Sequence, residues 1–197
     1  MTRIVAGHAG GRRLSVPPSG TRPTSDRVRE ALFSSLDSLL TGFAGKRVLD
    51  LYAGSGAVGL EAWSRGAAGV VLVESAASAV KVLRANVANL RDVRPAGGGA
   101  AGKIQVVASR AEKAAAELAA SDFDVVFADP PYDLASVQVA GVLATLAQRG
   151  VPRPGAVVVV ERATRDRWGW PLGYAALHDR KYGDATLHYA TFDAALL

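Results

Sequence analysis

The pattern of apolar and polar positions changes near residue 46. From there on, short apolar runs alternate with stretches in which apolar residues recur at helical spacing. Runs that are apolar at consecutive positions are typical of strands buried on both faces, so the alternation predicts a parallel sheet covered by helices on both sides. The predicted strands are 47–52, 69–74, 104–108, 123–128 and 155–161, and the predicted helices are 58–66, 78–90, 110–120 and 134–150. Residues 174–192 read as two strands joined at Gly183 and Asp184, an antiparallel hairpin that completes the sheet.

Residues 1–41 do not follow this alternation. Two short segments, 3–7 and 12–16, flank Gly10 and Gly11 and predict a small β-hairpin. A helix is expected to start near residues 24 and 25, a threonine and a serine that can each cap it, and to end at Gly42. Its apolar face is predicted to hold Val28, Leu32, Leu36, Leu39 and Leu40. We therefore expect an N-terminal extension over residues 1–41 and one larger domain over residues 42–197.

The composition is that of a globular protein, with 49% hydrophobic and 21% charged residues. The chain has no cysteine, which excludes disulfides, thiolate metal ligands and a cysteine nucleophile. No apolar run approaches the length of a membrane span, and the first residues lack the apolar core of a signal peptide. These features predict a cytoplasmic protein without membrane contact.

Positive charge is concentrated at the start of the chain. The first 30 residues hold six arginines against two acidic residues, a net charge of +4 out of +5 for the whole chain. The planar guanidinium group suits bidentate contacts with phosphate, so the cluster predicts a segment that faces a polyanion. The six residues are Arg3, Arg12, Arg13, Arg22, Arg27 and Arg29.

Candidate chemistry lies at the ends of the predicted strands, because ligands of a doubly wound sheet bind beyond the carboxyl ends of its strands. Residues 54–59 follow the first strand and match the pattern G-x-G-x-x-G, which by itself would equally suit a dinucleotide-dependent oxidoreductase. Asp50 favours another ligand, since a carboxylate inside the end of an apolar strand can meet an ammonium group. Tyr52 and Ala53 also make the connection between the strand end and the first glycine longer than in dehydrogenases.

The next two strand ends carry further candidate cofactor contacts. Glu74 ends the second strand, about 20 residues after the glycines, where a carboxylate can bind both hydroxyls of a ribose. Ser109 and Arg110 follow the third strand and are candidates for the surface beside an adenine ring. A second interpretation of Ser109, as the N-cap of the following helix, stays open.

The fourth strand runs into FADPPYD, residues 127–133. Pro130 and Pro131 can neither continue a helix nor donate ladder hydrogen bonds, and a residue before a proline is restricted to extended conformations. The motif therefore predicts a stiff spur that holds the Asp129 carboxylate and the Tyr132 ring in a fixed relation.

The glycine-rich turn, the acid after the second strand and the Asp-Pro-Pro-Tyr motif together resemble the S-adenosylmethionine-dependent amino methyltransferases. Residues 3–14, 22–36 and 181–190 extend the resemblance, along almost the whole chain, to the RsmD family of bacterial 16S rRNA guanine-N2 methyltransferases. It implies an α/β, Rossmann-like class I methyltransferase fold with a seven-stranded, mostly parallel sheet and one reversed strand. It also implies S-adenosylmethionine as the cofactor, bound by Asp50, Ala53, Gly54, Gly56, Gly59, Glu74, Ser109, Arg110 and Asp129.

The requirements for methylating a purine amino group give a reason for the residues of the spur. The lone pair of a purine amine is delocalised into the ring, so methylation requires the nitrogen to become tetrahedral and to carry positive charge. A carboxylate and a main-chain carbonyl that accept the two amino hydrogens favour this change, and Asp129 and Pro130 are the candidates. Tyr132 would stack on an extruded base, with Pro131 fixing its position. No metal is expected, because the methyl group on a positive sulfur is already activated.

Other functions remain open on the sequence alone. A DNA adenine-N6 methyltransferase uses the same motif, and a non-catalytic RNA-binding protein could retain the fold. A dehydrogenase is the most distant alternative. Within the leading hypothesis the expected partner is 16S rRNA in the assembled small ribosomal subunit, since a small chain without a separate reader domain gains specificity from the shape of a particle. We expect a monomer.

Overall fold

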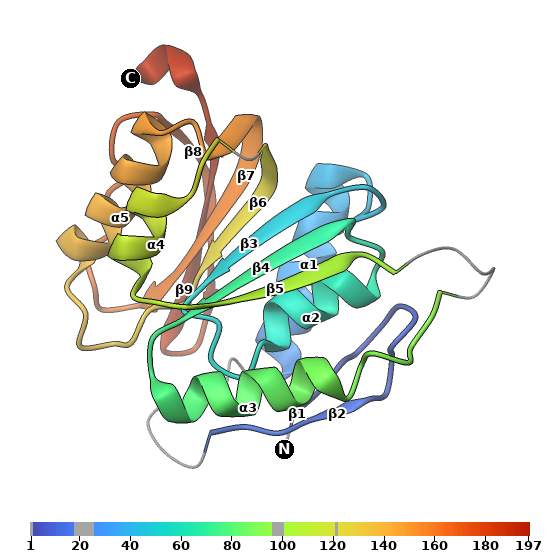
Figure 1. Cartoon of the computed structure of the whole chain (residues 1–197). Helices are drawn as coiled ribbons and strands as arrows, with labels where there is room; N and C mark the ends of the chain where they lie inside the picture. Colours follow the sequence, from blue (N-terminus) through green and yellow to red (C-terminus); the bar gives the residue numbers. More distant parts are fainter. Residues whose placement is uncertain (1, 18–25, 96–100, 121) are drawn as a thin grey trace.

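The computed structural model describes residues 2–17, 26–95, 101–120 and 122–197, and its main feature is a seven-stranded sheet (Figure 1). The strand order is β5-β4-β3-β6-β7-β9-β8. Strand β9 runs opposite to the other six strands of this sheet, so the predicted sheet with one reversed strand is confirmed. The strands are β3 (Arg47–Leu51), β4 (Gly69–Glu74), β5 (Lys103–Ala108), β6 (Phe123–Ala128), β7 (Pro152–Ala163), β8 (Tyr174–Tyr182) and β9 (Ala185–Phe192).

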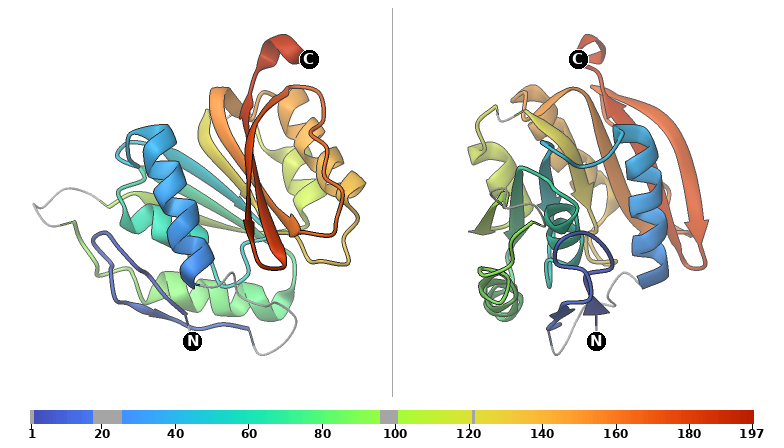
Figure 2. Two further views of the ribbon diagram at one scale, coloured as in Figure 1. Left: turned by 180° about the vertical axis from the view of Figure 1, so that it is seen from behind. Right: turned by 90° about the vertical axis from the view of Figure 1, so that its right-hand side faces the viewer.

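Helices cover both faces of the sheet, as the alternating pattern predicts (Figure 2). One face packs against α1 (Asp26–Leu40), α2 (Ala57–Ser64) and α3 (Ala77–Ala88), and the other against α4 (Ala111–Glu117) and α5 (Ser136–Gln148). Strand β6 serves both cores, because Val125 and Phe127 point to the first face and Val126 and Ala128 to the second. A short 3₁₀ helix, Ala194–Leu196, follows the last strand. Among the described residues, no helix has both the length and the apolar character to cross a membrane.

The expectation that every parallel strand is buried on both faces is wrong for β5. This strand lies at one edge of the sheet, and each of its residues is partly or largely exposed, whereas all six residues of β6 are buried. The difference follows from position, since an edge strand has one neighbour and fewer helices above and below it.

The N-terminal extension forms the predicted hairpin and helix. Strands β1 (Thr2–Arg3) and β2 (Arg13–Leu14) pair antiparallel. On α1 the predicted apolar face is buried except for Leu39, which is 40% exposed because it points away from the sheet. The predicted capping residues Thr24 and Ser25 lie outside the described residues.

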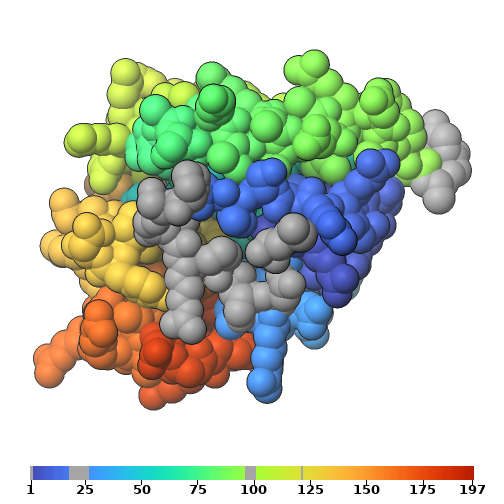
Figure 3. Space-filling view, turned by 90° about the horizontal axis from the view of Figure 1, so that it is seen from below, coloured from blue at the N-terminus to red at the C-terminus, as the bar shows by residue number. Residues whose placement is uncertain are grey.

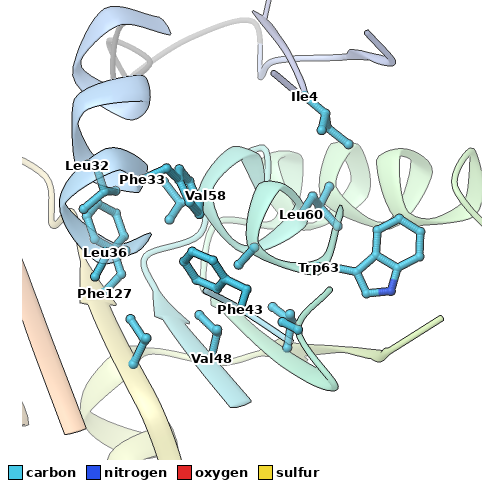
Figure 4. Close-up of a cluster of buried hydrophobic side chains, with 14 of the residues drawn as sticks. Ile4, Leu32, Phe33, Leu36, Phe43, Val48, Val58, Leu60, Trp63 and Phe127 are labelled. Atoms are coloured by element: carbon cyan, nitrogen blue, oxygen red, sulfur yellow. The ribbon is translucent and has the colours of Figure 1, made fainter. Parts of the chain in front are cut away.

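The extension shares its core with the rest of the chain. Ile4 of the hairpin region and Phe33 of α1 belong to the same cluster of buried side chains as Val48 and Trp63 (Figure 4). Burial of apolar surface is the main stabilising contribution to folding, so the hairpin and α1 gain much of their stability from contacts with the rest of the chain.

Candidate active site

The candidate site lies where β3, β4 and β6 end side by side. Leu51 is in register with Val73 of β4 and with Ala128 of β6. Because the three strands are parallel, the turn after β3, Glu74 and Asp129 meet at one edge of the sheet. The structure thus brings together residues that are up to about 80 positions apart in the chain.

The glycine-rich turn lets α2 start close to the sheet. Gly59 lies on the first turns of α2, and a Cβ atom there would lie 2.2 Å from Cδ2 of Leu72 and 3.2 Å from Oδ2 of Asp50. Only glycine permits this approach, which places the N-terminus of the helix over the carboxyl ends of the strands. The turn itself contains Tyr52 in a left-handed conformation, with φ of 63°.

Glu74 fixes this turn with its carboxylate. Oε2 accepts a hydrogen bond of 2.8 Å from the backbone N–H of Gly54, and Oε1 accepts bonds of 2.8 and 2.7 Å from those of Ser75 and Ala76. Charge-assisted bonds of this kind are stronger than neutral ones. The sequence suggested Glu74 as a ribose ligand, and the structure adds that the same carboxylate holds two turns in place.

Asp50 is a buried acid at the centre of the site. It is 2% exposed, and its Oδ2 accepts a 2.9 Å hydrogen bond from the Gly59 N–H. Burial raises the pKa of Asp50 to about 8, the Gly59 N–H opposes this, and the charges of Asp129 and Glu74 raise the pKa further. Three carboxyl groups within electrostatic reach of one another make a site that favours a cationic ligand. The ammonium and sulfonium groups of S-adenosylmethionine fit that requirement.

The spur after β6 is held on its far side by a residue that the sequence analysis did not single out. Arg162 of β7 is 2% exposed and donates through Nη2 to the Leu134 carbonyl at 2.7 Å and to Asp166 at 3.0 Å. The Leu134 N–H in turn bonds to the Pro131 carbonyl at 3.0 Å. The signal in the sequence was weak: Arg162 follows Glu161 directly after the apolar run of β7, within a strand that is otherwise buried, and buried charges are almost always paired.

Within the spur, the first two residues are more buried than the last two. Asp129 is partly buried and Pro130 is buried, whereas Pro131 is exposed and the Tyr132 side chain is 48% exposed. The carboxylate therefore sits at the sheet edge beside Asp50, and the aromatic ring stands further out. This order suits a planar substrate that enters from solvent and meets the acid last.

Ser109 and Arg110 lie beside the same edge. The Ser109 N–H bonds to the Glu74 carbonyl at 2.9 Å, which places Ser109 next to the turn after β4. The interpretation of Ser109 as a helix N-cap is wrong, because α4 begins after Arg110 and no side chain caps it. Arg110 is exposed.

The predicted RNA-facing arginines differ in exposure. Arg3, Arg12, Arg13 and Arg27 are exposed. Arg29 is fully buried and donates to Thr2 Oγ1 at 2.8 Å and to the Arg3 carbonyl at 2.6 Å. The prediction that Arg29 contacts RNA is therefore wrong, since its guanidinium group joins α1 to β1 inside the protein. Arg22 lies outside the described residues.

Buried polar side chains on α2 and α3 hold the hairpin arm, residues 2–15, against the site. Glu61 is fully buried and accepts hydrogen bonds from the backbone N–H groups of Val5 and Ala6 at 2.5 and 2.9 Å. Asn86 bonds to both the N–H and the carbonyl of Ser15, and its Nδ2 also donates to the Ser55 carbonyl in the glycine-rich turn. The sequence analysis missed both residues, although an acid and an amide within apolar helix faces were visible.

A seven-stranded sheet with one reversed strand, a glycine-rich turn after β3 and acids at the ends of the strands on either side of it define a Rossmann-like class I methyltransferase fold. The family model described as Conserved hypothetical protein 95 matches residues 2–191. The chain belongs to this family, the RsmD family.

Named relatives agree with this placement. The chain is 42% identical over 131 residues to the ribosomal RNA small subunit methyltransferase D of Escherichia coli K12, an alignment that covers 66% of this chain and 60% of the relative. The corresponding protein of Haemophilus influenzae is 33% identical over 161 residues, with 81% of this chain and 77% of the relative covered. The solved structure of the Escherichia coli protein yhhF superposes with a TM-score of 0.79 at 32% identity, covering 98% of both chains.

Proposed function

We propose that this protein transfers a methyl group from S-adenosylmethionine to the exocyclic N2 of one guanine in 16S rRNA. The observation that carries the proposal is the position of Asp129, which begins a proline-stiffened spur and lies close enough to Asp50 for its charge to raise the pKa of that buried acid. Asp129, which we assign to the target amine, and the glycine-rich turn, which we assign to the cofactor, thus lie in one site. The relatives named as small-subunit rRNA methyltransferases support an rRNA substrate.

S-adenosylmethionine supplies an electrophilic methyl group on a positive sulfur. We assign its ammonium group to Asp50 and its ribose to Glu74. Gly54, where an added Cβ atom would meet no other atom within 4 Å, leaves room for the ligand, whereas Gly56 and Gly59 let the turn and α2 pack closely against Leu83 and Leu72. Ala53 and Gly56 close the turn with a 2.7 Å backbone hydrogen bond, so the surface that the ligand meets is set before binding. We assign Ser109 and Arg110 to the surface along the adenine, and the hydrogen bond from the Ser109 N–H to the Glu74 carbonyl supports this.

The chain's own groups then act on the amine. Asp129 accepts one hydrogen of the N2 amino group and the Pro130 carbonyl accepts the other, which turns the nitrogen lone pair toward the methyl group. As the N–C bond forms and the C–S bond breaks, positive charge on nitrogen is stabilised by the Asp129 carboxylate. The product nitrogen then loses one proton, which passes from Asp129 to solvent. Tyr132 stacks on the base, and neither step requires a metal or a covalent intermediate.

The wider setting is part of the same proposal. The chain would act as a cytoplasmic monomer on assembled small ribosomal subunits, with Arg3, Arg12, Arg13 and Arg27 on phosphates. Arg22 stays in this set as a prediction from the sequence.

The test uses small subunits from a strain that lacks this methyltransferase, incubated with the purified protein and S-adenosylmethionine. Mass spectrometry of the digested rRNA should find one N2-methylguanine. The Asp129→Ala variant should react about 10²–10³-fold more slowly, because it loses a charged acceptor for the transition state, while its cofactor affinity changes no more than a few-fold. The Asp129→Asn variant keeps an acceptor oxygen and should retain intermediate activity.

The control is Asp92→Asn, an equal change of charge at an exposed residue beyond the end of α3. Methylation of adenine in DNA and none in rRNA would replace the proposal by its main alternative. Full activity of Asp129→Ala would remove Asp129 from the mechanism.

A further inference from the structure

A hollow of about 460 Å³ opens beside the spur, on the side away from the glycine-rich turn. Its walls come from Tyr132, from residues 163–165 at the end of β7, and from Gly183 and Asp184 in the turn between β8 and β9. The volume lies within the range of small-ligand sites, roughly 300–1,000 Å³. Figure 3 shows the face concerned, where the segments coloured yellow and orange adjoin.

The floor of the hollow is fixed by hydrogen bonds. The Thr164 N–H donates to the Asp184 carbonyl at 2.7 Å, and Thr164 Oγ1 donates to the Gly183 carbonyl at 3.1 Å. Thr164 Oγ1 also lies 3.0 Å from Thr186 Oγ1. The β8–β9 turn is therefore tied to the end of β7, so groups on it are held in place before a ligand arrives.

Two opposite charges stand in this hollow without neutralising partners. Arg165 and Asp184 are both exposed, and within the described part of the chain neither side chain forms an ion pair. Together with Asp129 beyond Tyr132, the site offers one strong donor and two strong acceptors around an aromatic ring. Charged donors and acceptors beside a stacking surface are suited to the polar edge of a base.

We propose that this hollow receives the target base and that Asp184 selects guanine by accepting its N1–H. The inference rests on the proposed function. The Watson–Crick edge of guanine presents the O6 acceptor, the N1–H donor and the N2 amino donors in a row. Arg165, Asp184 and Asp129 supply the complementary donor, acceptor and acceptor. Adenine would present a donor to Arg165 and an acceptor to Asp184, so both contacts would be repulsive.

The experiment separates the N1–H contact from the chemistry at N2. The guanine methylated by the wild-type protein is mapped first, and small subunits are then reconstituted with 2-aminopurine at that position. This base keeps the 2-amino group but lacks N1–H and O6. The wild-type protein should methylate it about 10- to 100-fold more slowly than guanine, because Asp184 and Arg165 lose their partners.

The decisive variant is Asp184→Asn. Asparagine is well tolerated in turns, and its amide can donate to the unprotonated N1 of 2-aminopurine. The variant should be about 10-fold slower on guanine, and its preference for guanine over 2-aminopurine should fall to a few-fold. Cofactor affinity and the thermal midpoint should stay unchanged, and Asp92→Asn should keep the wild-type preference.

If the wild-type protein is active and Asp184→Asn keeps the full preference for guanine over 2-aminopurine, this inference is wrong, whereas the proposed function is not affected. Absence of any methylated guanine with the wild-type protein would instead overturn the proposed function. A variant that loses affinity for S-adenosylmethionine would show that the β8–β9 turn belongs to the cofactor site, which also contradicts the inference.

Discussion

At the scale of single residues, the acids of the candidate site have a structural role beside the chemical one that we propose for them. Glu74 holds two turns through three backbone N–H groups, and Asp50 accepts the Gly59 N–H that brings α2 onto the sheet. Burial and neighbouring carboxylates make Asp50 hard to ionise until a cation arrives. The burial of Asp50 beside two other carboxyl groups therefore disfavours its charge in the absence of a ligand, and the same arrangement would attract a cationic cofactor.

Asp50 should make stability fall as pH rises. Its pKa in the folded protein is raised from 3.8 to about 8, so between these values the folded state holds a proton that the unfolded state has lost. Unfolding free energy should then decrease with pH by at most about 1.4 kcal/mol per unit across that window. Asp50→Asn, which keeps an acceptor for Gly59, should remove this slope.

Urea unfolding of the two proteins from pH 5 to 8 measures the difference. Asp129 and Glu74, which face Asp50, are present in both proteins, so their contributions cancel in the comparison. Parallel profiles for the two proteins would mean that Asp50 is ionised throughout.

At the scale of elements, the hairpin arm is attached to α2 and α3 by polar contacts in a buried setting. A Cβ atom on Gly7, whose φ is 82°, would lie 1.9 Å from the Ser64 carbonyl, so the arm runs directly against α2. Ser64 Oγ accepts the Ala9 N–H at 2.9 Å, and Asn86 connects the end of the arm to the glycine-rich turn. The arm is therefore a fixed wall beside the site.

Replacing Glu61 by alanine should release the arm. The change leaves the N–H groups of Val5 and Ala6 without an acceptor and removes one of the two acidic partners of Arg65, whose Nε lies 2.9 Å from Oε1. Loss of one partner from a buried charged network typically costs about 3–5 kcal/mol. Limited proteolysis should cut within residues 2–15 faster than in the wild type. The exposed Glu117→Ala serves as the control, and equal cutting in all three proteins would contradict the role of Glu61.

At the scale of the whole molecule, the arm, the glycine-rich turn and the spur share one face (Figures 1 and 3). Nearly all the net charge of the chain lies before residue 31, and four of the arginines there are exposed. A polyanion held by the arm would therefore extend toward the spur rather than toward α4 and α5, which lie on the other face of the sheet.

Changing Arg12 and Arg13 together to alanine should weaken binding of small subunits and flatten its dependence on salt. Each lost phosphate contact lowers the slope of log K against log salt by about 0.7–0.9, so the pair should lower it by roughly one to two. Binding across a salt series measures the slope, and calorimetry should show unchanged affinity for S-adenosylmethionine. The double change Lys113→Ala with Arg149→Ala, on α4 and at the end of α5, is the matched control. An unchanged slope with lost cofactor affinity would make the arm part of the cofactor site.

The sequence by itself determined the order of strands and helices and the C-terminal hairpin, and it predicted the place of the candidate site. These features follow from neighbouring residues: apolar runs and helical spacing choose local structure, and the prolines beside Asp129 restrict the chain wherever it lies. Strand ends could be recognised as the site because parallel strands must present them at one edge.

Only the tertiary structure decided which residues of the same type are buried in the fold and which are exposed to a ligand. Arg29 and Arg27 are two positions apart, yet one is buried against β1 and the other is exposed. Glu61 and Arg162 have partners 56 and 28 residues away, and nothing in the local sequence names those partners. Leu39 and strand β5 are more exposed than the sequence predicted, because burial depends on which elements pack against a residue. Contacts between distant segments fix the surroundings of a side chain, and those surroundings determine whether a charge binds a ligand or holds the fold together.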